Sequence, residues 1–429
     1  SGSSQARDKR RKKKKELRHA GKPQKEHPLR GRRQGVRRRN VMENFVFENP
    51  TKVFFGKGCV REYLSGLAAP YQGSIMLAWG GGSIRRNGVY DEVCAALRAT
   101  GRKIVEFSGI MSNPTYKKVL EGAALARKEN VGLIIAVGGG SVMDCCKCIA
   151  LMMTNDGDIW DYSLSVNGGK KQPAHNAAPI VAITTSAGTG SEVDMASVIT
   201  NEKTQEKTGI FFTSMFPTLS IVDSNLMMSV PPKFTAYQGM DAFYHASESV
   251  INKNEHPMGE MFALKAIELI AKYLPAAYRD GSNKEARAYV ALANTLAGYY
   301  MLCTSQHTME HVMGGYHDDL VHGAGLIMIS HAYFDFFAER KAAEEPMIKM
   351  AKAMGVENPT SGKDFIRALD NLIAAVGCDN LRMSDAGITK EELKKYPKRV
   401  HEVLGGDITA DPLPLSDADY LAIYEKSYR

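Results

Sequence analysis

The stretch LIIAVGGGSVMD (133–144) joins a short apolar run to three glycines and the start of a helical pattern. LIIAV (133–137) has the length and composition of a buried strand. Glycines let the backbone approach a ligand closely, and the N–H groups at the start of a helix attract phosphate. The stretch therefore predicts a strand, a glycine loop at 138–141 and a helix, with a phosphate group bound at the loop. A strand-to-helix turn without a ligand is the alternative.

The rest of the first half repeats this rhythm of strand and helix. The predicted strands are SIMLAW (74–79), KIVEF (103–107) and IVAI (180–183), and the predicted helices cover 89–101 and 116–132, the second ending at a glycine. Strands that alternate with helices favour a mostly parallel sheet with helices on both faces. We therefore expect residues 42–230 to form an α/β, Rossmann-like dinucleotide-binding domain, although the G-x-G-x-x-G fingerprint is absent.

The pattern becomes helical from about Pro231. ALKAIELIAKYL (263–274) and EARAYVALANTLAGYYM (285–301) are the clearest examples. A boundary at the PP pair (231–232) gives a second, all-α domain at 231–429. The cleft between two domains is a common place for a ligand site.

Charge sets the N-terminal segment apart from the rest of the chain. Residues 1–41 hold 17 Lys/Arg against 3 Asp/Glu, whereas the remainder holds 38 basic and 44 acidic residues. The segment has no apolar periodicity, which predicts a disordered extension. Globular patterning starts at Met42, which we expect to be the natural start. Binding of nucleic acid through the basic extension is the alternative, and the body itself is expected to bind none.

Composition argues against a membrane protein and against a disulfide framework. No apolar run approaches the ~18 residues that a membrane span needs. Seven cysteines, three of them in CCKC (145–148), show no regular framework and no second pair with the spacing of a zinc finger. Reduced thiols and a cytoplasmic location are expected.

Two more loops follow predicted strands. WGGGSIRRNG (79–88) carries Arg85 and Arg86 and no carboxylate. An acidic residue at such a place typically binds the ribose 2′-hydroxyl of NAD, whereas basic groups accommodate the 2′-phosphate of NADP. The loop therefore favours NADP(H), with a surface turn of solvated arginines as the alternative. TTSAGTGSE (184–192) offers hydroxyls and glycines for a pyrophosphate or a nicotinamide, although such clusters are usually plain loops.

Histidines and one aspartate gather in the second half. MDAFYHASES (240–249) places Asp241 and His245 four positions apart, on one face of a helix. Such a pair alone is more often an ordinary helix contact. TSQHTMEHVMGGYHDDLVHGAG (304–325) then adds His307, His311, His317 and His322 within 16 residues. One carboxylate with three imidazoles suits Zn²⁺ or Fe²⁺ and leaves a coordination position open, so the combination favours a catalytic metal site.

GGGSVMD, TTSAGTGSE, GMDAFYHASES and HTMEHVMGGYHDDLVHGAGL, in this order and spacing, resemble the iron-containing (group III) alcohol dehydrogenase family. The similarity runs from Met42 to the C-terminus and is greatest to the NADPH-dependent butanol dehydrogenase and aldehyde reductase branch. The resemblance implies a dinucleotide-binding domain, a helical metal-binding domain, an architecture like that of dehydroquinate synthase, and a homodimer.

The resemblance also implies roles for individual residues. Asp241, His245, His307 and His322 would be the metal ligands, and His311 a proton relay. The spacing from His307 to His322 is 15, one more than in many members, which leaves His311 or His317 as alternative ligands. The implied cofactor contacts are Gly81, Gly82, Ser83, Gly138, Gly139, Gly140, Ser141, Asp144, Thr184, Thr185, Thr189, Ser191 and Lys207, the last of them near the 2′-phosphate.

The activity implied is hydride transfer between NADP(H) and a primary alcohol or aldehyde, with one divalent metal, Fe²⁺ or Zn²⁺, polarising the substrate oxygen. Two other activities on the same fold remain as alternatives. One is a polyol dehydrogenase of the glycerol type, and the other is a lyase similar to dehydroquinate synthase.

Overall fold

The computed structural model describes residues 44–403 and 410–429. Phe45–Arg429 form one compact unit. The basic segment 1–41, for which the sequence predicts disorder, lies outside the described residues, and so do positions 42 and 43.

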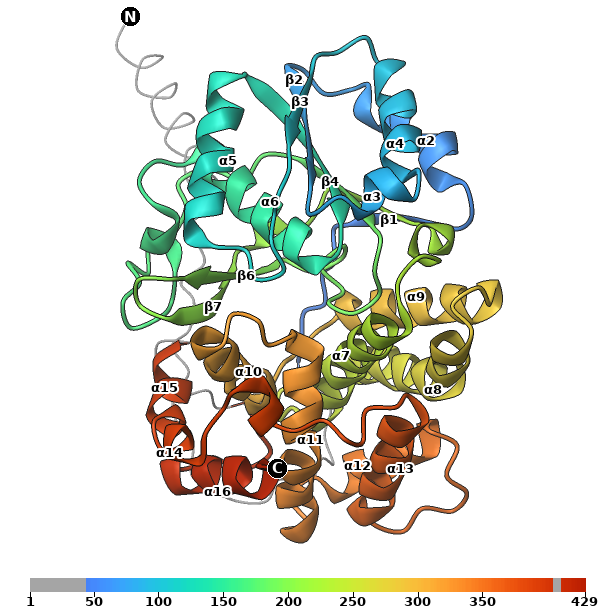
Figure 1. The fold of residues 1–429 in the computed structure, drawn as a ribbon, viewed down its shortest axis with the longest axis vertical. Helices are drawn as coiled ribbons and strands as arrows, with labels where there is room; N and C mark the ends of the chain where they lie inside the picture. Colours follow the sequence, from blue (N-terminus) through green and yellow to red (C-terminus); the bar gives the residue numbers. More distant parts are fainter. Residues whose placement is uncertain (1–43, 404–409) are drawn as a thin grey trace, which may run out of the picture. The chain divides into compact units, whose positions relative to one another are not determined.

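Six parallel strands form the sheet that the alternating pattern predicts (Figure 1). Their order is β1-β8-β5-β4-β2-β3, and every neighbouring pair is parallel. The bounds are β1 Lys52–Phe55, β2 Ser74–Trp79, β3 Ile104–Phe107, β4 Val131–Gly138, β5 Ile180–Thr184 and β8 Leu219–Val222. All four predicted strands are confirmed, while the short strands β1 and β8 at one edge were not predicted.

Helices cover both faces of this sheet. Along β2, Ile75 and Leu77 pack in one core with α2 (Cys59–Ala68) and α4 (Val89–Arg98). Met76 and Ala78 pack in another core with α5 (Tyr116–Lys128) and α6 (Gly140–Thr154). Figure 1 shows the two pairs of helices on opposite sides of the strands. A strand that is apolar on both faces is typical of a doubly wound α/β fold, as expected.

The strand order reverses next to β4. The chain moves outward from β2 to β3, returns past β2 to β4, and then continues to β5 on the other side. In open α/β sheets, ligands bind outside the carboxyl ends of the strands at such a reversal. The glycine loops after β2 and β4 leave the sheet at this place.

Both helices predicted in the first half end earlier than expected, and the one predicted over 89–101 ends at Arg98. The helix predicted over 116–132 ends at Lys128, and Asn130 then adopts a left-handed φ of 49°. Gly132, expected to end the helix, lies inside β4. A Cβ at Gly132 would lie 1.9 Å from the carbonyl oxygen of Gln72, so this glycine permits a close backbone approach.

An antiparallel hairpin, β6 (Ala196–Asn201) and β7 (Glu206–Phe211), connects β5 to β8 and was not predicted. A four-residue helix, α3 (Ser83–Arg86), follows the loop after β2. Short 3₁₀ helices lie at Ile159–Tyr162, Thr213–Met215, Ser224–Met227 and Ser384–Ala386.

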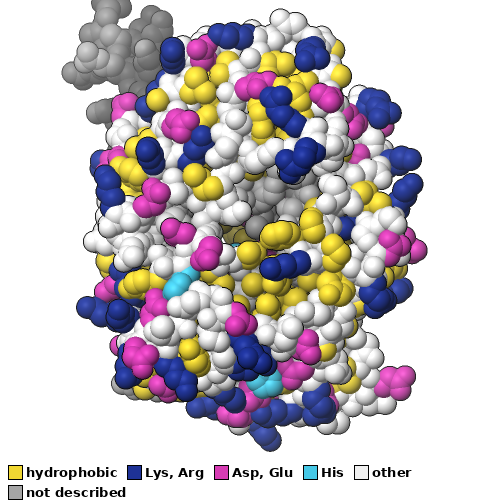
Figure 2. Space-filling model, in the orientation of Figure 1, with side chains coloured by type: hydrophobic (Ala, Val, Ile, Leu, Met, Phe, Trp, Pro, Cys, Tyr) yellow, Lys and Arg dark blue, Asp and Glu magenta, His cyan; other side chains and the backbone are white. Residues whose placement is uncertain are grey.

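From Pro232 onward the described residues form helices, as the sequence predicts. They are α7 Pro232–Ile251, α8 Pro257–Arg279, α9 Lys284–Tyr299, α10 Ser305–Tyr316, α11 His322–Glu339, α12 Glu344–Ala353, α13 Gly362–Ala375, α14 Lys390–Leu393, α15 Tyr396–Val403 and α16 Asp417–Ser427. Helix α7 is buried on nearly all sides and packs against α8, α9 and α11. Figure 2 shows a hollow in the middle of one face, with apolar side chains along its lower side.

None of the helices in the described ranges is both long enough and apolar enough to cross a bilayer. All seven cysteines are free thiols, and the CCKC cysteines lie inside α6 in the core beneath the sheet. Burial raises the pKa of Cys146 to well above its usual value, which keeps this thiol protonated. The CCKC motif is therefore part of the core packing.

Candidate metal centre

Helix α7 carries the first two predicted ligands in its buried interior. Asp241 and His245 are 4% and 5% exposed. Their spacing places them one turn apart on the same face of α7. His307 lies in the first turn of α10, and His322 is the first residue of α11. The four predicted ligands therefore come from three helices.

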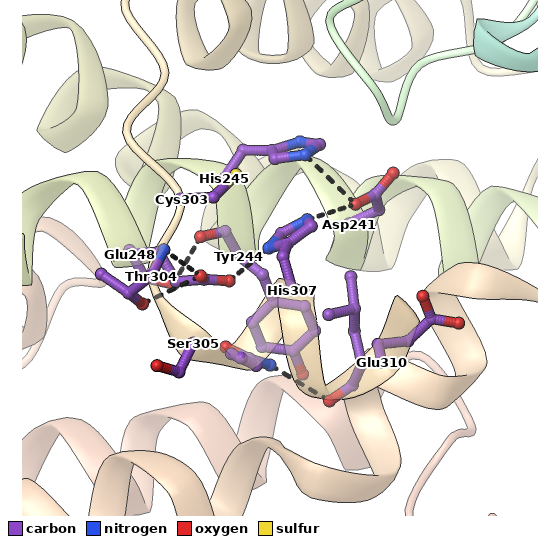
Figure 3. Close-up of polar contacts among 12 residues, drawn as sticks. Asp241, Tyr244, His245, Glu248, Cys303, Thr304, Ser305, His307 and Glu310 are labelled. Carbon is purple, nitrogen blue, oxygen red and sulfur yellow. Dashed lines mark hydrogen bonds and ion pairs between the residues drawn. The ribbon is translucent and has the colours of Figure 1, made fainter. Parts of the chain in front are cut away.

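Three imidazoles converge on one carboxylate oxygen. The Nε2 atoms of His245, His307 and His322 lie 3.7, 3.3 and 3.5 Å from Oδ1 of Asp241. Figure 3 shows His245 and His307 both directed at Asp241. The structure thus brings together all four residues that the resemblance implies as ligands.

The second nitrogen of each imidazole is held by an acceptor. Nδ1 of His245 lies 3.2 Å from the carbonyl oxygen of Gly188. Nδ1 of His307 contacts Glu248, and Nδ1 of His322 contacts Glu310. When Nδ1 donates to these acceptors, each Nε2 presents a lone pair toward Asp241. This is the arrangement by which proteins orient histidine ligands of a metal.

The distances and the charges both fit a divalent cation. Ligand atoms of a tetrahedral site with bonds of about 2.0–2.2 Å lie about 3.3–3.6 Å apart, close to the three distances observed. The hydrogen-bonded cluster holds the carboxylates of Asp241, Glu248 and Glu310 and the ammonium of Lys207. With neutral imidazoles its charge is −2, which one divalent cation balances. A donor set of three nitrogens and one oxygen accepts Zn²⁺ and Fe²⁺ alike.

The imidazoles of the cluster differ in their electrostatics. Burial alone would lower the pKa values of His307 and His322, but Cys303 and Glu248 raise that of His307 and Glu310 raises that of His322, so a metal ion would displace protons from these two rings on binding. Burial lowers the pKa of His245 to about 3, so its imidazole is neutral at physiological pH, as a metal ligand must be. Burial alone would raise the pKa of Asp241, but the facing imidazoles hold it below the usual range. Asp241 is therefore ionised.

The other two histidines of the cluster do not face Asp241. His311 is half-buried, and its ring centroid lies 5.5 Å from that of His322. The pKa of His311 lies well below its usual value, and burial is the largest cause. Nε2 of His317 lies 3.0 Å from Glu392, on α14. The extra residue between His307 and His322 falls in the turn before α11, and His322 still reaches Asp241.

The three predicted glycine and hydroxyl loops meet at the carboxyl ends of β2, β4 and β5, which are neighbours in the sheet. The N–H of Thr185 donates to the carbonyl oxygen of Gly138 at 2.9 Å. A Cβ at Gly139 would lie 2.6 Å from Oγ of Ser186, and one at Gly140 would lie 2.3 Å from Thr189. The glycines of the β4 loop are therefore required by contact with the β5 loop.

Helix α6 begins at Gly140, and its N-cap, Gly139, has no side chain to cap it. The hydroxyl of Ser141 donates to the carbonyl oxygen of Ser112 and does not cap the helix. The first N–H groups of α6 thus have no side-chain cap at the strand reversal, where an anionic ligand is favoured.

Several predicted cofactor residues hydrogen-bond within the protein. Thr184 donates to the carbonyl oxygen of Ser186, and Thr189 accepts from the N–H of Ser191. Ser191 in turn donates to Asp144 at 2.6 Å, and burial raises the pKa of Asp144 to about 6. These side chains shape the β4 and β5 loops.

The two arginines that follow β2 have different surroundings. Arg85 pairs with Glu106 at 3.0 Å and lies 4.0 Å above the ring of Tyr90. The guanidinium of Arg86 lies over Gly82, where a Cβ would be 2.9 Å from it. Around Gly81 there is open space, and Ser83 is exposed at the start of α3.

Lys207 lies in the histidine cluster, whereas the resemblance suggested a place near the 2′-phosphate. Its Nζ is 3.1 Å from Glu310 and 3.5 Å from Nδ1 of His322. The predictions from sequence missed Glu248 and Glu310 altogether. The signal for them was weak, an acidic residue inside an otherwise buried helix segment, three positions after His245 and His307.

Comparison with known proteins agrees with this geometry. The family model "Iron-containing alcohol dehydrogenase" matches residues 50–224, and that for the C-terminal part of the Fe-containing family matches 235–428. NADH-dependent butanol dehydrogenase A of Clostridium acetobutylicum is 31% identical over 400 residues, which cover 90% of this chain and 100% of the relative. The 1,3-propanediol dehydrogenase of Klebsiella pneumoniae is 36% identical over 350 residues, or 80% and 88% of the two chains.

Solved structures give the same result. An archaeal halo-thermophilic alcohol dehydrogenase from a Red Sea brine pool has a TM-score of 0.85 at 30% identity, covering 90% of this chain and 99% of its own. NADH-dependent butanol dehydrogenase A of Thermotoga maritima has a TM-score of 0.81 at 30% identity, with the same coverage of both chains. Since both halves of the chain match, and since its relatives are covered almost end to end, the chain belongs to the iron-containing alcohol dehydrogenase family.

Proposed function

We propose that this member of the family is a metal-dependent alcohol dehydrogenase and aldehyde reductase that transfers hydride between NADP(H) and a primary alcohol or aldehyde. The observation that carries the proposal is the convergence of three Nε2 atoms on Oδ1 of Asp241. Asp241, His245, His307 and His322 would hold a divalent cation, which would supply Lewis acidity for a carbonyl or alcohol oxygen. A bound nicotinamide would supply or accept the hydride.

The chain's own residues position these groups and handle the proton. Glu248 and Glu310 hold the Nδ1–H of His307 and His322, so that each Nε2 stays directed at Asp241. His311 lies beside His322 and is half-buried. One ring nitrogen of His311 can exchange a proton with the substrate oxygen while the other exchanges with solvent.

The cofactor would lie along the carboxyl ends of β2, β4 and β5. The start of α6, at Gly139 and Gly140, offers backbone N–H groups to the pyrophosphate. The open space at Gly81 leaves room for the adenosine ribose. This assignment agrees with the place of ligands in doubly wound sheets.

The preference for NADP(H) rests on charge at the loop after β2. Arg86 lies over Gly82, and in the described part of the chain it has no carboxylate partner, whereas Arg85 is paired with Glu106. Arg86 is thus available for the 2′-phosphate, and Glu106 is already neutralised. Four relatives are named NADH-dependent butanol dehydrogenases, which makes NADH the competing expectation.

The alcohol itself has competing candidates. Relatives named 1,3-propanediol dehydrogenase and choline dehydrogenase are as similar to this chain as the butanol dehydrogenases. A diol is therefore the second candidate substrate. We also propose a boundary between the two domains at Pro231, a homodimer and a cytoplasmic location.

The test is a kinetic screen of purified, metal-loaded protein. We expect oxidation of NADPH with butyraldehyde, and a kcat/KM for NADPH at least about 10-fold above that for NADH, since a charge-assisted contact contributes about 1.5–3 kcal/mol. Equal kcat/KM values would refute the NADP(H) preference. No turnover with aldehydes, alcohols or diols under either cofactor would refute the proposed activity.

A further inference from the structure

Lys207 and Glu310 form a buried ion pair directly behind one predicted metal ligand. Oε2 of Glu310 accepts from Nζ of Lys207 at 3.1 Å and also contacts Nδ1 of His322. The side chains of Lys207 and Glu310 are 5% and 0% exposed. Lys207 comes from β7, Glu310 from α10 and His322 from α11, so three separate elements meet at this contact.

The three acceptors behind the imidazoles differ in charge. His245 faces the neutral carbonyl of Gly188. Glu248, behind His307, accepts from the N–H and Oγ1 of Thr304 at 2.6 and 2.9 Å, which are neutral donors. Glu310 is the only one of the three whose neighbour is a cation, Lys207. The contact that orients His322 therefore involves an ion pair with Lys207, whereas the contacts that orient His245 and His307 do not.

Packing fixes Glu310 in this position. A Cβ at Gly325 would lie 2.8 Å from Cγ of Glu310, and one at Gly314 would lie 3.1 Å from Nζ of Lys207. Oε1 of Glu310 is buried without a hydrogen-bond partner among the described residues. Leaving a buried carboxylate oxygen unpaired is costly, and such a group in a native structure calls for a role beyond stability.

His322 is also the most accessible of the three imidazole ligands. Its side chain is 24% exposed, against 5% for His307 and 6% for His245. The most exposed proposed ligand, His322, is thus the one whose Nδ1 contacts the Lys207–Glu310 ion pair.

We propose that Lys207 and Glu310 are positioning residues that set, with opposite signs, how tightly His322 holds the metal. Glu310 strengthens the hold because its carboxylate orients the Nδ1–H and adds negative charge behind the imidazole. Lys207 weakens the hold because its ammonium offsets that charge and repels a nearby cation. The inference rests on the proposed metal centre.

The test compares Glu310→Gln, Lys207→Met and the double variant with wild type. Apo protein is titrated with Co²⁺ against a competing chelator, and the visible absorption of bound Co²⁺ and the thermal midpoint of the apo protein are recorded. Glu392→Gln is the matched control, because Glu392 pairs with His317, which is outside the four proposed ligands.

Glu310→Gln keeps a hydrogen-bond acceptor and removes the charge, so we expect Co²⁺ to bind about 10- to 100-fold more weakly, with an altered spectrum. Lys207→Met is expected to bind Co²⁺ more tightly than wild type, by about 3-fold or more. Both single variants should melt earlier than wild type, because each breaks a buried pair. The double variant should regain stability but bind Co²⁺ as Glu310→Gln does.

A merely structural pair would weaken metal binding in both single variants, in step with their stability, and that result would overturn the inference. Wild-type affinity in Glu310→Gln would overturn it as well. If Glu310→Gln does not fold, the direction of change in Lys207→Met decides. Failure of wild type and Glu392→Gln to bind Co²⁺ at all would instead refute the metal centre of the proposed function.

Discussion

Asp241 is the residue on which the proposed chemistry of this protein depends. A buried carboxylate with three imidazole nitrogens within 3.7 Å is an unusual use of a helix interior. Ionised groups are rarely buried unless they are paired or coordinate a metal. A divalent cation held between the carboxylate and the three imidazoles would balance this charge.

At the residue scale, Arg86→Ala tests the cofactor preference. We expect KM for NADPH to rise about 10-fold and KM for NADH to stay unchanged, because the lost guanidinium would contact only the 2′-phosphate. Arg85→Ala is the matched control, and its effect should be smaller because Arg85 is already paired with Glu106. An equal rise in KM for both cofactors in Arg86→Ala would show that Arg86 does not bind the 2′-phosphate.

The buried carboxyl group of Asp411 predicts how the stability of the protein depends on pH. It accepts from the N–H of Ser305 at 3.1 Å and contacts the hydroxyl of Tyr333, and burial raises its pKa to about 6. Because the folded-state pKa lies above the unfolded value, the contribution of Asp411 to stability is present at low pH and is lost as pH rises through about 6. Asp411→Asn removes this titration.

We therefore expect the stability of Asp411→Asn relative to wild type to improve by about 1–3 kcal/mol between pH 4 and pH 8. Thermal midpoints at matched pH values measure the difference. The charge of Glu248 also raises the pKa of Asp411, and Glu248 is present in both proteins. Parallel pH curves would contradict the prediction.

At the scale of elements, the contact between the β4 and β5 loops governs the proposed cofactor groove. Gly140→Ala would push a Cβ to 2.3 Å from Thr189, and we expect it to lower stability by about 1–3 kcal/mol. Gly81→Ala meets nothing within 4 Å, and we expect unchanged stability with weaker nucleotide binding, because the Cβ would occupy the space proposed for the ribose. Denaturant unfolding without cofactor compares the two, and equal losses would contradict this account of the loops.

Elements with a clear apolar pattern or with predicted helices on both sides could be predicted from the sequence, and other short elements could not. β2 was predicted with its observed bounds because SIMLAW is bounded by polar and glycine residues. β1 and β8 have only four residues each, and unlike the equally short β3 they do not lie between two predicted helices. Gly132 was assigned to a helix end because a glycine after a helical pattern usually ends it, and nothing local reveals the carbonyl of Gln72 that lies against it.

At the scale of the whole molecule, metal removal should destabilise the protein. Without the cation, the cluster around Asp241 keeps an uncompensated charge between α7, α10 and α11. We expect the thermal midpoint to fall after chelation and to recover when Zn²⁺ or Fe²⁺ is added, with about 2.7 kcal/mol gained at a free metal concentration of 100 times Kd. An unchanged midpoint in demonstrably metal-free protein would contradict this expectation.

The site shows the same limit of prediction as the fold. The convergence of the proposed ligands could be predicted because Asp241 and His245 lie one helical turn apart and His307 belongs to a dense histidine cluster. Glu310 and Lys207 could not be paired, because they are 103 positions apart and meet only when β7 packs against α10. Local spacing thus identifies residues that share a helix face, while contacts between distant elements need the folded chain.

The most direct test of the account is the metal content of purified protein, measured by elemental analysis for wild type, His245→Ala and His331→Ala. His331 pairs with Asp370 away from the centre and serves as the matched control. We predict one divalent metal per chain in wild type and in His331→Ala, and loss of both metal and aldehyde reduction in His245→Ala. Full activity in metal-free His245→Ala protein would contradict the central claim.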